Sequence, residues 1–361
     1  MKIVSIVGAR PQFIKAAAVS RKLRERHQEI LVHTGQHYDY EMSGIFFDGL
    51  EMPRPDANLE IGSGPHGAQT GAMLKAIEEV LVVERPDAVL VYGDTNSTLA
   101  GALAAAKLSV PVAHVEAGLR SFNRGMPEEI NRVMADHLSH LLLCPSDTAV
   151  RNLAAEGIFE NVHLVGDVML DVLNWAKQHA GGNGNRPAVL SRFGLSERAY
   201  LLATVHRSEN TNDVAQLSRI FEALDSLEEP IVFPVHPRTR KMIGEMGFRP
   251  RPHLHLIDPV GYLDMVALVG SARSVLTDSG GLQKEAYWLG VPCVTLRNET
   301  EWVETVETGW NVLAGSDRDK ILRAVNSWNP PDSRPALYGD GAAASKCVDL
   351  IAAGLSCDGS R

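Results

Sequence analysis

This 361-residue chain has few cysteines and no apolar run long enough to cross a bilayer. Its four cysteines lie far apart, without the CxxC spacing of a metal or redox site, and predict reduced thiols. No stretch approaches the roughly 18 apolar residues of a membrane-spanning helix. The apolar run after the N-terminus is broken by Arg10 and Pro11, unlike the core of a signal peptide. We therefore predict a cytoplasmic protein that does not engage a membrane.

The chain also lacks a basic surplus and the usual cofactor motifs. Its 35 Lys and Arg residues against 44 Asp and Glu give a net charge of -9, which argues against a nucleic-acid partner. The GxGxxG fingerprint of a nicotinamide dinucleotide site and the Walker phosphate loop are both absent. HExxH, paired-cysteine and DxDxDG patterns are absent too. We therefore expect no cofactor and no metal.

Short β-branched runs alternate with helical patterns along the whole chain, which favours an α/β fold with parallel sheets. Residues 179–187, HAGGNGNRP, form the best linker candidate. We predict two Rossmann-like, doubly wound domains at 1–178 and 188–339, and a C-terminal helix in 340–361 that returns to the first domain. The predicted strands are 2–8, 29–35, 88–93, 110–116, 141–146, 162–166, 200–205, 230–235, 254–257, 274–278 and 292–296.

Three acids follow strand or helix signals in the first half. Asp94 and Glu116 each end a buried-strand pattern, and Glu128 lies in a helix predicted to begin at Pro127. Ligands of open parallel sheets bind beyond the carboxyl ends of the strands, so these acids are candidates for proton transfer. Asp94 could instead cap a helix, and Glu128 could complement a helix dipole. For Glu116 a purely structural role is the least favoured, because the Ala117-Gly118 that follow it suit a tight loop rather than a helix cap.

Two glycine-containing turns are candidate phosphate sites. In TDSGGLQKEA (277–286), paired glycines at a helix N-terminus would let backbone N–H groups approach an anion. The alternative is a tight turn with an Asp cap. In GARPQFIK (8–15), Arg10 and Lys15 could hold a diphosphate or could be ordinary surface cations. Glu285 lies about two turns into its helix, within reach of ribose hydroxyls.

Two further segments place a histidine beyond a strand, namely His206-Arg207 and His236 in PVHPRT. A lone histidine there is more often a loop hydrogen-bonder than a catalyst. Two such segments facing one cleft would favour a functional role.

With these residues in place, the sequence resembles the non-hydrolysing UDP-N-acetylglucosamine 2-epimerase family over nearly its whole length. The resemblance implies two Rossmann-like domains of the glycosyltransferase-B type, an interdomain active site, no cofactor, and a homodimer. It implies that UDP leaves as the C2 proton is removed, giving a 2-acetamidoglucal to which UDP adds back. The matching motifs are GARPQFIK, HTGQHYD (33–39), YGDTNSTLAGALAA (92–105), HVEAGLRS (114–121), MPEEINR (126–132), VGDVMLD (165–171), TVHRSEN (204–210), PVHPRT (234–239) and TDSGGLQKEA.

By this resemblance, residues of both halves match the family's functional positions. Asp94 and Glu116 would transfer protons at C2, His206 would support the diphosphate, and Glu128 would position or relay a proton. Gln36, Arg207 and His236 match a second, regulatory UDP-GlcNAc site of some bacterial members. The positions that match UDP-binding residues are Arg10, Lys15, Ser279, Gly280, Gly281 and Glu285.

Two features resemble a subgroup that acts on a different sugar. The loop from Glu116 to Glu128 is two residues shorter than in many bacterial members, and Trp302 stands where many have an Arg. That subgroup includes epimerases of UDP-2,3-diacetamido-2,3-dideoxyglucuronate, which is the alternative substrate. A UDP-sugar glycosyltransferase of the same architecture, and a non-catalytic nucleotide-sugar sensor, are more distant alternatives.

Overall fold

The computed structural model describes residues 1–35, 52–180 and 187–355. The chain divides into two compact units, and each is described by itself. Unit 1 comprises Met1–Asn174 and Ala336–Arg361, and unit 2 comprises Trp175–Pro335. The predicted domains were 1–178, 188–339 and 340–361; three of these internal limits differ by four residues from those of the units, and unit 2 starts 13 residues before the predicted 188.

Unit 1 contains a seven-stranded parallel sheet in the order β3-β2-β1-β4-β5-β6-β7. Its strands are β1 (Lys2–Val7), β2 (Gln28–His33), β3 (Ala57–Asn58), β4 (Ala88–Tyr92), β5 (Val112–Val115), β6 (Leu141–Cys144) and β7 (Val162–Leu164). Its helices are α1 (Arg10–Arg24), α3 (His66–Glu84), α4 (Asn96–Lys107), α5 (Pro127–Leu138), α6 (Asp147–Ala155), the first part of α7 (Val168–Ala180) and α16 (Ala343–Gly354).

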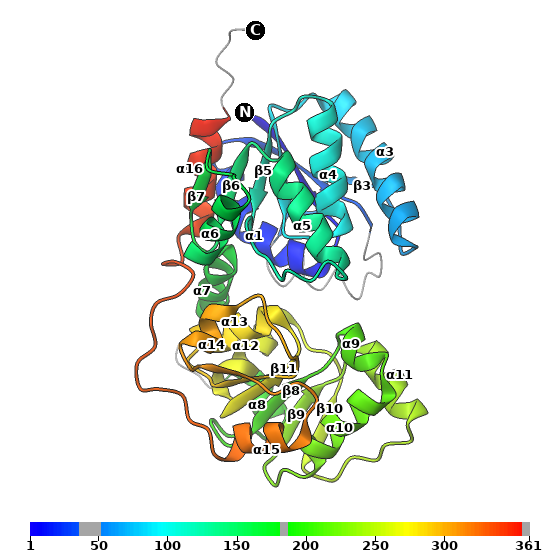
Figure 1. The fold of residues 1–361 in the computed structure, drawn as a ribbon, viewed down its shortest axis with the longest axis vertical. Helices are drawn as coiled ribbons and strands as arrows, with labels where there is room; N and C mark the ends of the chain where they lie inside the picture. The colour runs from blue at the N-terminus through cyan, green and yellow to red at the C-terminus, as the bar shows by residue number, and fades with distance from the viewer. Residues whose placement is uncertain (36–51, 181–186, 356–361) are drawn as a thin grey trace. The chain divides into compact units, whose positions relative to one another are not determined.

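Helices cover both faces of this sheet (Figure 1). Helices α3, α4 and α5 lie side by side on one face, while α1 and α16 lie together on the other. The strands are accordingly apolar on both faces, as in β4, whose five residues AVLVY are all buried. The alanine-rich α4 lets its backbone approach the sheet, and Gly101 has no room for a Cβ beside Ile6.

Unit 2 repeats the plan with a six-stranded parallel sheet in the order β10-β9-β8-β11-β12-β13. Helices α10, α11 and α15 contribute to the core on one face, and α8, α12 and α13 to the core on the other. Its strands are β8 (Leu201–Thr204), β9 (Ile231–Pro234), β10 (Leu254–Ile257), β11 (Ser274–Thr277), β12 (Cys293–Thr295) and β13 (Asn311–Leu313). Its helices are the rest of α7, α8 (Ala188–Arg192), α9 (Ser208–Thr211), α10 (Val214–Asp225), α11 (Pro237–Glu245), α12 (Tyr262–Ser271), α13 (Gly280–Trp288), α14 (Val303–Glu307) and α15 (Arg318–Asn326).

The C-terminal segment is anchored in unit 1 before its helix starts. The Tyr338 carbonyl accepts a hydrogen bond from Asp167 N at 2.8 Å. The Asp171 carboxylate then accepts from the first two backbone amides of α16, Ala343 at 3.1 Å and Ala344 at 3.0 Å. These contacts explain why unit 1 resumes at Ala336, four residues before the boundary that the sequence predicts.

Two strands were not expected from the sequence. β3 and β13 have two and three residues, and each lies at the edge of its sheet. Runs this short give no alternation that distinguishes them from loops. Within the described ranges, no helix is long and apolar enough to cross a membrane.

Candidate functional site

The sheet of unit 1 reverses its strand order between β1 and β4, the place where open α/β sheets bind ligands. The buried Gln12 side chain joins the loops after these two strands. Its Oε1 accepts from Gly8 N at 2.8 Å and Ala9 N at 3.1 Å, and its Nε2 donates to Tyr92 O at 2.9 Å. The β1–α1 turn, which brings in Lys15, is thereby fixed against the end of β4, which brings in Asp94.

Lys15 and Glu116 form a buried ion pair at this edge of the sheet. The Lys15 ammonium donates to Glu116 Oε2, and their side chains are only 11% and 7% exposed. Burial alone would lower the Lys15 pKa, but the negative charges of Glu116, Asp94 and Asp167 outweigh it and raise that pKa above its ordinary value. Lys15 is therefore held as a cation, and it neutralises Glu116.

The backbone around this pair is shaped for it. Gly93 has φ +61°, and a Cβ there would lie 3.1 Å from Lys15 Nζ and 3.2 Å from Glu116 Oε2. Glu116 itself has φ +73°, a left-handed conformation that costs a non-glycine residue about 1–3 kcal/mol. Its neighbours hold it there, since Glu116 N and Ala117 N both donate to Leu143 O, at 3.0 and 3.2 Å.

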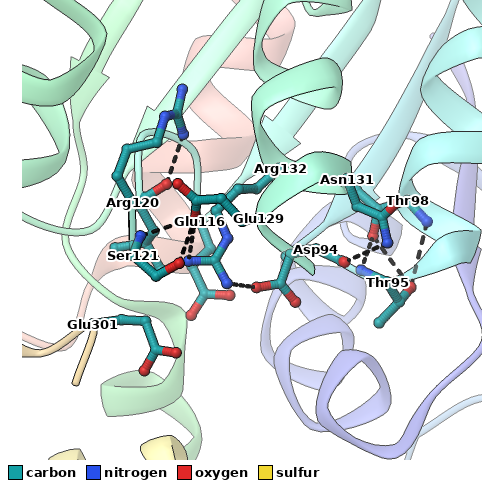
Figure 2. A network of polar contacts seen from close by, with 12 residues as sticks. Asp94, Thr95, Thr98, Glu116, Arg120, Ser121, Glu129, Asn131, Arg132 and Glu301 are labelled. Atoms are coloured by element: carbon teal, nitrogen blue, oxygen red, sulfur yellow. Dashed lines mark hydrogen bonds and ion pairs between the residues drawn. The ribbon is translucent and has the colours of Figure 1, made fainter. Parts of the chain in front are cut away.

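Asp94 is paired with a cation from α5. Arg132 Nη2 donates to Asp94 Oδ2 at 2.5 Å, and Asn131 Nδ2 donates to the Asp94 backbone carbonyl at 3.0 Å (Figure 2). The cap of α4 is Thr95, whose hydroxyl accepts from Thr98 N, so the capping alternative for Asp94 is wrong. The Asp94 side chain is 31% exposed and remains open to water.

The next acids along the chain have different environments. Glu128 is half-buried in the first turn of α5, and its carboxylate has no hydrogen bond or ion pair within the described residues. Glu129 is buried and accepts from Ser121 N, Ser121 Oγ and Phe122 N at 2.8, 2.9 and 2.9 Å. Its carboxylate also lies 3.4 Å from Arg132 Nη1. Glu129 therefore fixes the loop before α5 and the arginine that holds Asp94.

Unit 2 reverses its strand order between β8 and β11, and Asp278 lies at that point. This fully buried carboxylate accepts from His206 N at 3.0 Å and Arg207 N at 2.9 Å, and its Oδ1 lies 3.1 Å from His206 Nδ1. Burial would raise the Asp278 pKa, but the hydrogen bonds and charge of His206, with those from Arg207 and Asn210, bring it below its ordinary value. Asp278 thus orients His206 with a fixed negative charge.

His206 and His236 are close neighbours in unit 2. Their ring centroids are 6.0 Å apart, and both residues are partly exposed. His236 caps α11, since its side chain accepts from Arg238 N at 3.3 Å. The structure therefore brings His206, Arg207 and His236 together.

The N-terminus of α13 presents the two glycines of TDSGG. Ser279 is the N-cap residue and makes no side-chain cap hydrogen bond, so the predicted Asp cap is wrong. Trp302 packs on Gly280, where a Cβ would lie 3.0 Å from its Nε1, and the Lys284 ammonium lies 3.5 Å from the Trp302 ring centroid. A Cβ on Gly281 would meet only Ser279 Oγ, at 3.9 Å. Glu285 is buried one helical turn beyond.

Several site residues were not found from the sequence. Gln12, Glu129, Arg132 and Asp278 lie inside motifs that were recognised, but nothing in their spacing separates a buried anchor from its exposed neighbour. Gln12 has one usable signal, its position three residues after the helix cap. The Gln36 assignment and the Arg10 side chain lie outside the described residues. Within the described part of the chain, no group of His, Cys, Asp and Glu could hold a metal.

Two doubly wound parallel sheets, each with charged groups at its switch point, define a two-domain α/β enzyme of the glycosyltransferase-B type. The chain belongs to the UDP-N-acetylglucosamine 2-epimerase family, which it matches over residues 21–352, and it is therefore an isomerase. This confirms the fold class and the family that the sequence motifs predicted.

Relatives match the chain from end to end. A Methanococcus maripaludis protein named UDP-N-acetylglucosamine 2-epimerase homolog is 55% identical, over 97% of this chain and 99% of its own. The UDP-2,3-diacetamido-2,3-dideoxy-D-glucuronate 2-epimerase of Pseudomonas aeruginosa is 50% identical, over 98% of this chain and 99% of its own. The crystal structure of Methanocaldococcus jannaschii UDP-GlcNAc 2-epimerase in complex with UDP-GlcNAc and UDP has a TM-score of 0.91 at 43% identity, over 98% and 100%.

Proposed function

We propose that this enzyme interconverts UDP-N-acetylglucosamine and UDP-N-acetylmannosamine by eliminating UDP and adding it back. The observation that supports it most is the pair of carboxylates at the ends of adjacent strands β4 and β5, each with its own cation. Inverting C2 requires a proton to leave one face of the sugar and another to arrive at the opposite face. Two separately held acids provide for both transfers.

In the first half-reaction, one carboxylate takes the C2 proton. The electron pair of the C2–H bond becomes the C1=C2 double bond, and the C1–O bond breaks with its pair going to the UDP oxygen. The products are 2-acetamidoglucal, UDP and a protonated acid. Lys15 and Arg132 place a cation beside each carboxylate, which favours the negatively charged form that a general base requires.

In the second half-reaction, the UDP oxygen attacks C1 and an acid delivers a proton to C2 from the opposite face. That acid must have become protonated in the meantime. The Asp94 side chain is 31% exposed and can take up a proton from water, and the half-buried Glu128 would relay such a proton. The proton that enters C2 should therefore come from solvent.

Unit 2 would hold the leaving nucleotide. The backbone amides at the start of α13, at Ser279, Gly280 and Gly281, suit a diphosphate because the helix dipole adds to their charge. His206, oriented by Asp278, would support the leaving oxygen. Glu285 would accept from ribose. By family resemblance Lys15 matches a residue that binds the diphosphate, whereas its pairing with Glu116 suits a role in proton transfer.

The assignment of Gln36, Arg207 and His236 to a regulatory UDP-GlcNAc site, and of the chain to a homodimer, are parts of this proposal that rest on the family resemblance. The closeness of His206 and His236 supports the first, because a ligand held by His236 would lie next to a catalytic group.

A second candidate substrate is UDP-2,3-diacetamido-2,3-dideoxyglucuronate, favoured by the relative of that name at 50% identity. Its sugar carboxylate would need a partner cation. The two cations beside the candidate acids, Lys15 and Arg132, are already paired with carboxylates of the protein. This favours the uncharged sugar.

The test is to incubate the enzyme with each sugar and analyse products by NMR. We expect the manno epimer from UDP-N-acetylglucosamine, with a kcat/KM at least tenfold above that for the glucuronate analogue. The reverse ratio would establish the second candidate. A glycosyltransferase would instead release UDP only when an acceptor is added, and conversion of neither sugar would refute the epimerase proposal.

A further inference from the structure

A chain of four linked polar side chains lies behind the candidate acids; three are buried, and the outermost, Glu156, is exposed. His114, on β5, is fully buried, with Nδ1 2.7 Å from Asp136 Oδ1. Asp136 Oδ2 accepts from Arg120 Nη1 at 2.7 Å. Arg120 in turn donates to both oxygens of Glu156, at 2.6 and 2.9 Å. None of these side chains is needed for the reaction as proposed above.

The partners of His114 decide its protonation state. Nδ1 faces a carboxylate, and Nε2 lies 2.7 Å from the backbone carbonyl of Gly93. Both partners are acceptors only, so both ring nitrogens are placed to donate, as they do in an imidazolium. Burial would raise the Asp136 pKa, but hydrogen bonds and charges from His114 and Arg120 outweigh it and lower that pKa, which keeps the carboxylate ionised.

The same pair of residues holds both loops that bear the acids. The carbonyl that His114 binds belongs to Gly93, directly before Asp94. Asp136 Oδ2 also accepts from Gly118 N at 3.0 Å, two residues after Glu116. Gly93 and Gly118 both have positive φ, +61° and +81°. His114 and Asp136 therefore fix the two turns whose shape aims the carboxylates.

We propose that His114, as an imidazolium held by Asp136, is a positioning residue for proton transfer at C2. This inference rests on the proposed function. The hydrogen bond to the Gly93 carbonyl sets the direction in which Asp94 leaves β4, and the hydrogen bond from Gly118 sets that of Glu116. Loss of the hydrogen bond between His114 and the Gly93 carbonyl should disturb the angle between Asp94 and Glu116 without removing either acid.

Two near-isosteric variants separate positioning from simple packing. In H114Q the amide nitrogen can occupy the place of Nε2 and still donate to Gly93 O. In H114N the amide nitrogen can occupy the place of Nδ1, so it keeps Asp136 and loses Gly93. H137Q is the matched control, because His137 is 47% exposed and contacts the outer end of the same chain, Glu156, at 3.0 Å.

The measurement is the rate of deuterium entry at C2 in heavy water, with KM and melting temperature for each variant. Misplacing a catalytic group by about 1 Å can cost ~100-fold in rate, so H114N should lose about that factor in kcat while KM stays within about threefold. H114Q should lose less than about tenfold, and H137Q should match the wild type. The proposal would be overturned if H114N and H114Q had equal kcat. It would also be overturned if the loss of kcat in both variants followed their loss of melting temperature.

A second measurement does not depend on turnover. In nitrogen-15 NMR spectra of histidine-labelled enzyme, with H114Q identifying the signal, both His114 ring nitrogens should appear protonated. The Asp94 amide, which shares a peptide group with the Gly93 carbonyl, should shift in H114N and much less in H114Q. A singly protonated His114 would overturn the inference alone, whereas absence of C2 exchange in the wild type would overturn the proposed function and this inference with it.

Discussion

The ion pair of Lys15 and Glu116 offers the sharpest test of how the site is built. K15M leaves a carboxylate buried without its cation, and E116Q leaves an ammonium buried without its anion. Removing one partner of a buried pair costs about 3–5 kcal/mol, because the remaining charge is uncompensated. In a unit of 150–250 residues each kcal/mol corresponds to about 2–4 °C, so each single variant should melt about 6–20 °C lower.

The double variant K15M/E116Q removes both charges. Its melting temperature should therefore be no lower than that of the less stable single variant. The losses of the two single variants would then be far from additive. K22M is the matched control on the same helix. Lys22 pairs with Glu25 at 2.8 Å, but the two side chains are 47% and 57% exposed, and such surface pairs contribute only about 0–1 kcal/mol.

The pH dependence of the pair has a definite sign. Because the Lys15 pKa is raised in the folded protein, the pair stabilises fully below the unfolded value of about 10.4, and the contribution is lost as pH rises through the folded pKa. Wild type should therefore lose more stability than K15M in alkaline unfolding experiments. Additive melting-temperature losses in the double variant, or parallel alkaline curves, would refute the reasoning.

Three further predictions concern other buried groups. Because the Asp278 pKa is lowered, its contribution to stability is present above the unfolded value of about 3.9 and lost as pH falls, so D278N should flatten the acid limb of a melting-temperature profile; an unchanged limb would contradict this. E129Q should lower both the melting temperature and kcat, whereas E128Q should lower kcat alone. Equal losses of melting temperature in the two variants would show that Glu129 does not anchor the loop before α5. D171A removes the acceptor of the first amides of α16, at a cost of about 0.5–2 kcal/mol, and should speed hydrogen exchange in the first turn of that helix. Unchanged exchange there would count against the capping role.

The sheets could be predicted because parallel strands buried on both faces are nearly continuous apolar runs. AVLVY of β4 and LLLC of β6 are examples. The edge strand β3 could not be predicted, because its two residues, one half-buried and one exposed, show no pattern. The sequence gives no signal at the boundary between the units, because α7 continues through it as one helix.

At the site, the residue types and motifs were predictable but the partnerships were not. In the sequence, the neighbours Glu128 and Glu129 cannot be told apart. In the folded helix they point in different directions, so Glu128 is half-buried and Glu129 is buried. Lys15 lies 101 residues from Glu116, so nothing in the sequence could show that the fold pairs the two side chains. Arg132 holding Asp94 is likewise a long-range contact.

The central claim is that Asp94 and Glu116 move protons at C2 while UDP departs. The most direct measurement is the deuterium content at C2 of both epimers after the reaction in heavy water, for wild type, D94N and E116Q at matched UDP occupancy. We expect wild type to label C2 completely in the product, and each variant to bind UDP normally while labelling at least 100-fold more slowly. Product formed without deuterium at C2, or wild-type labelling rates in both variants, would contradict the account.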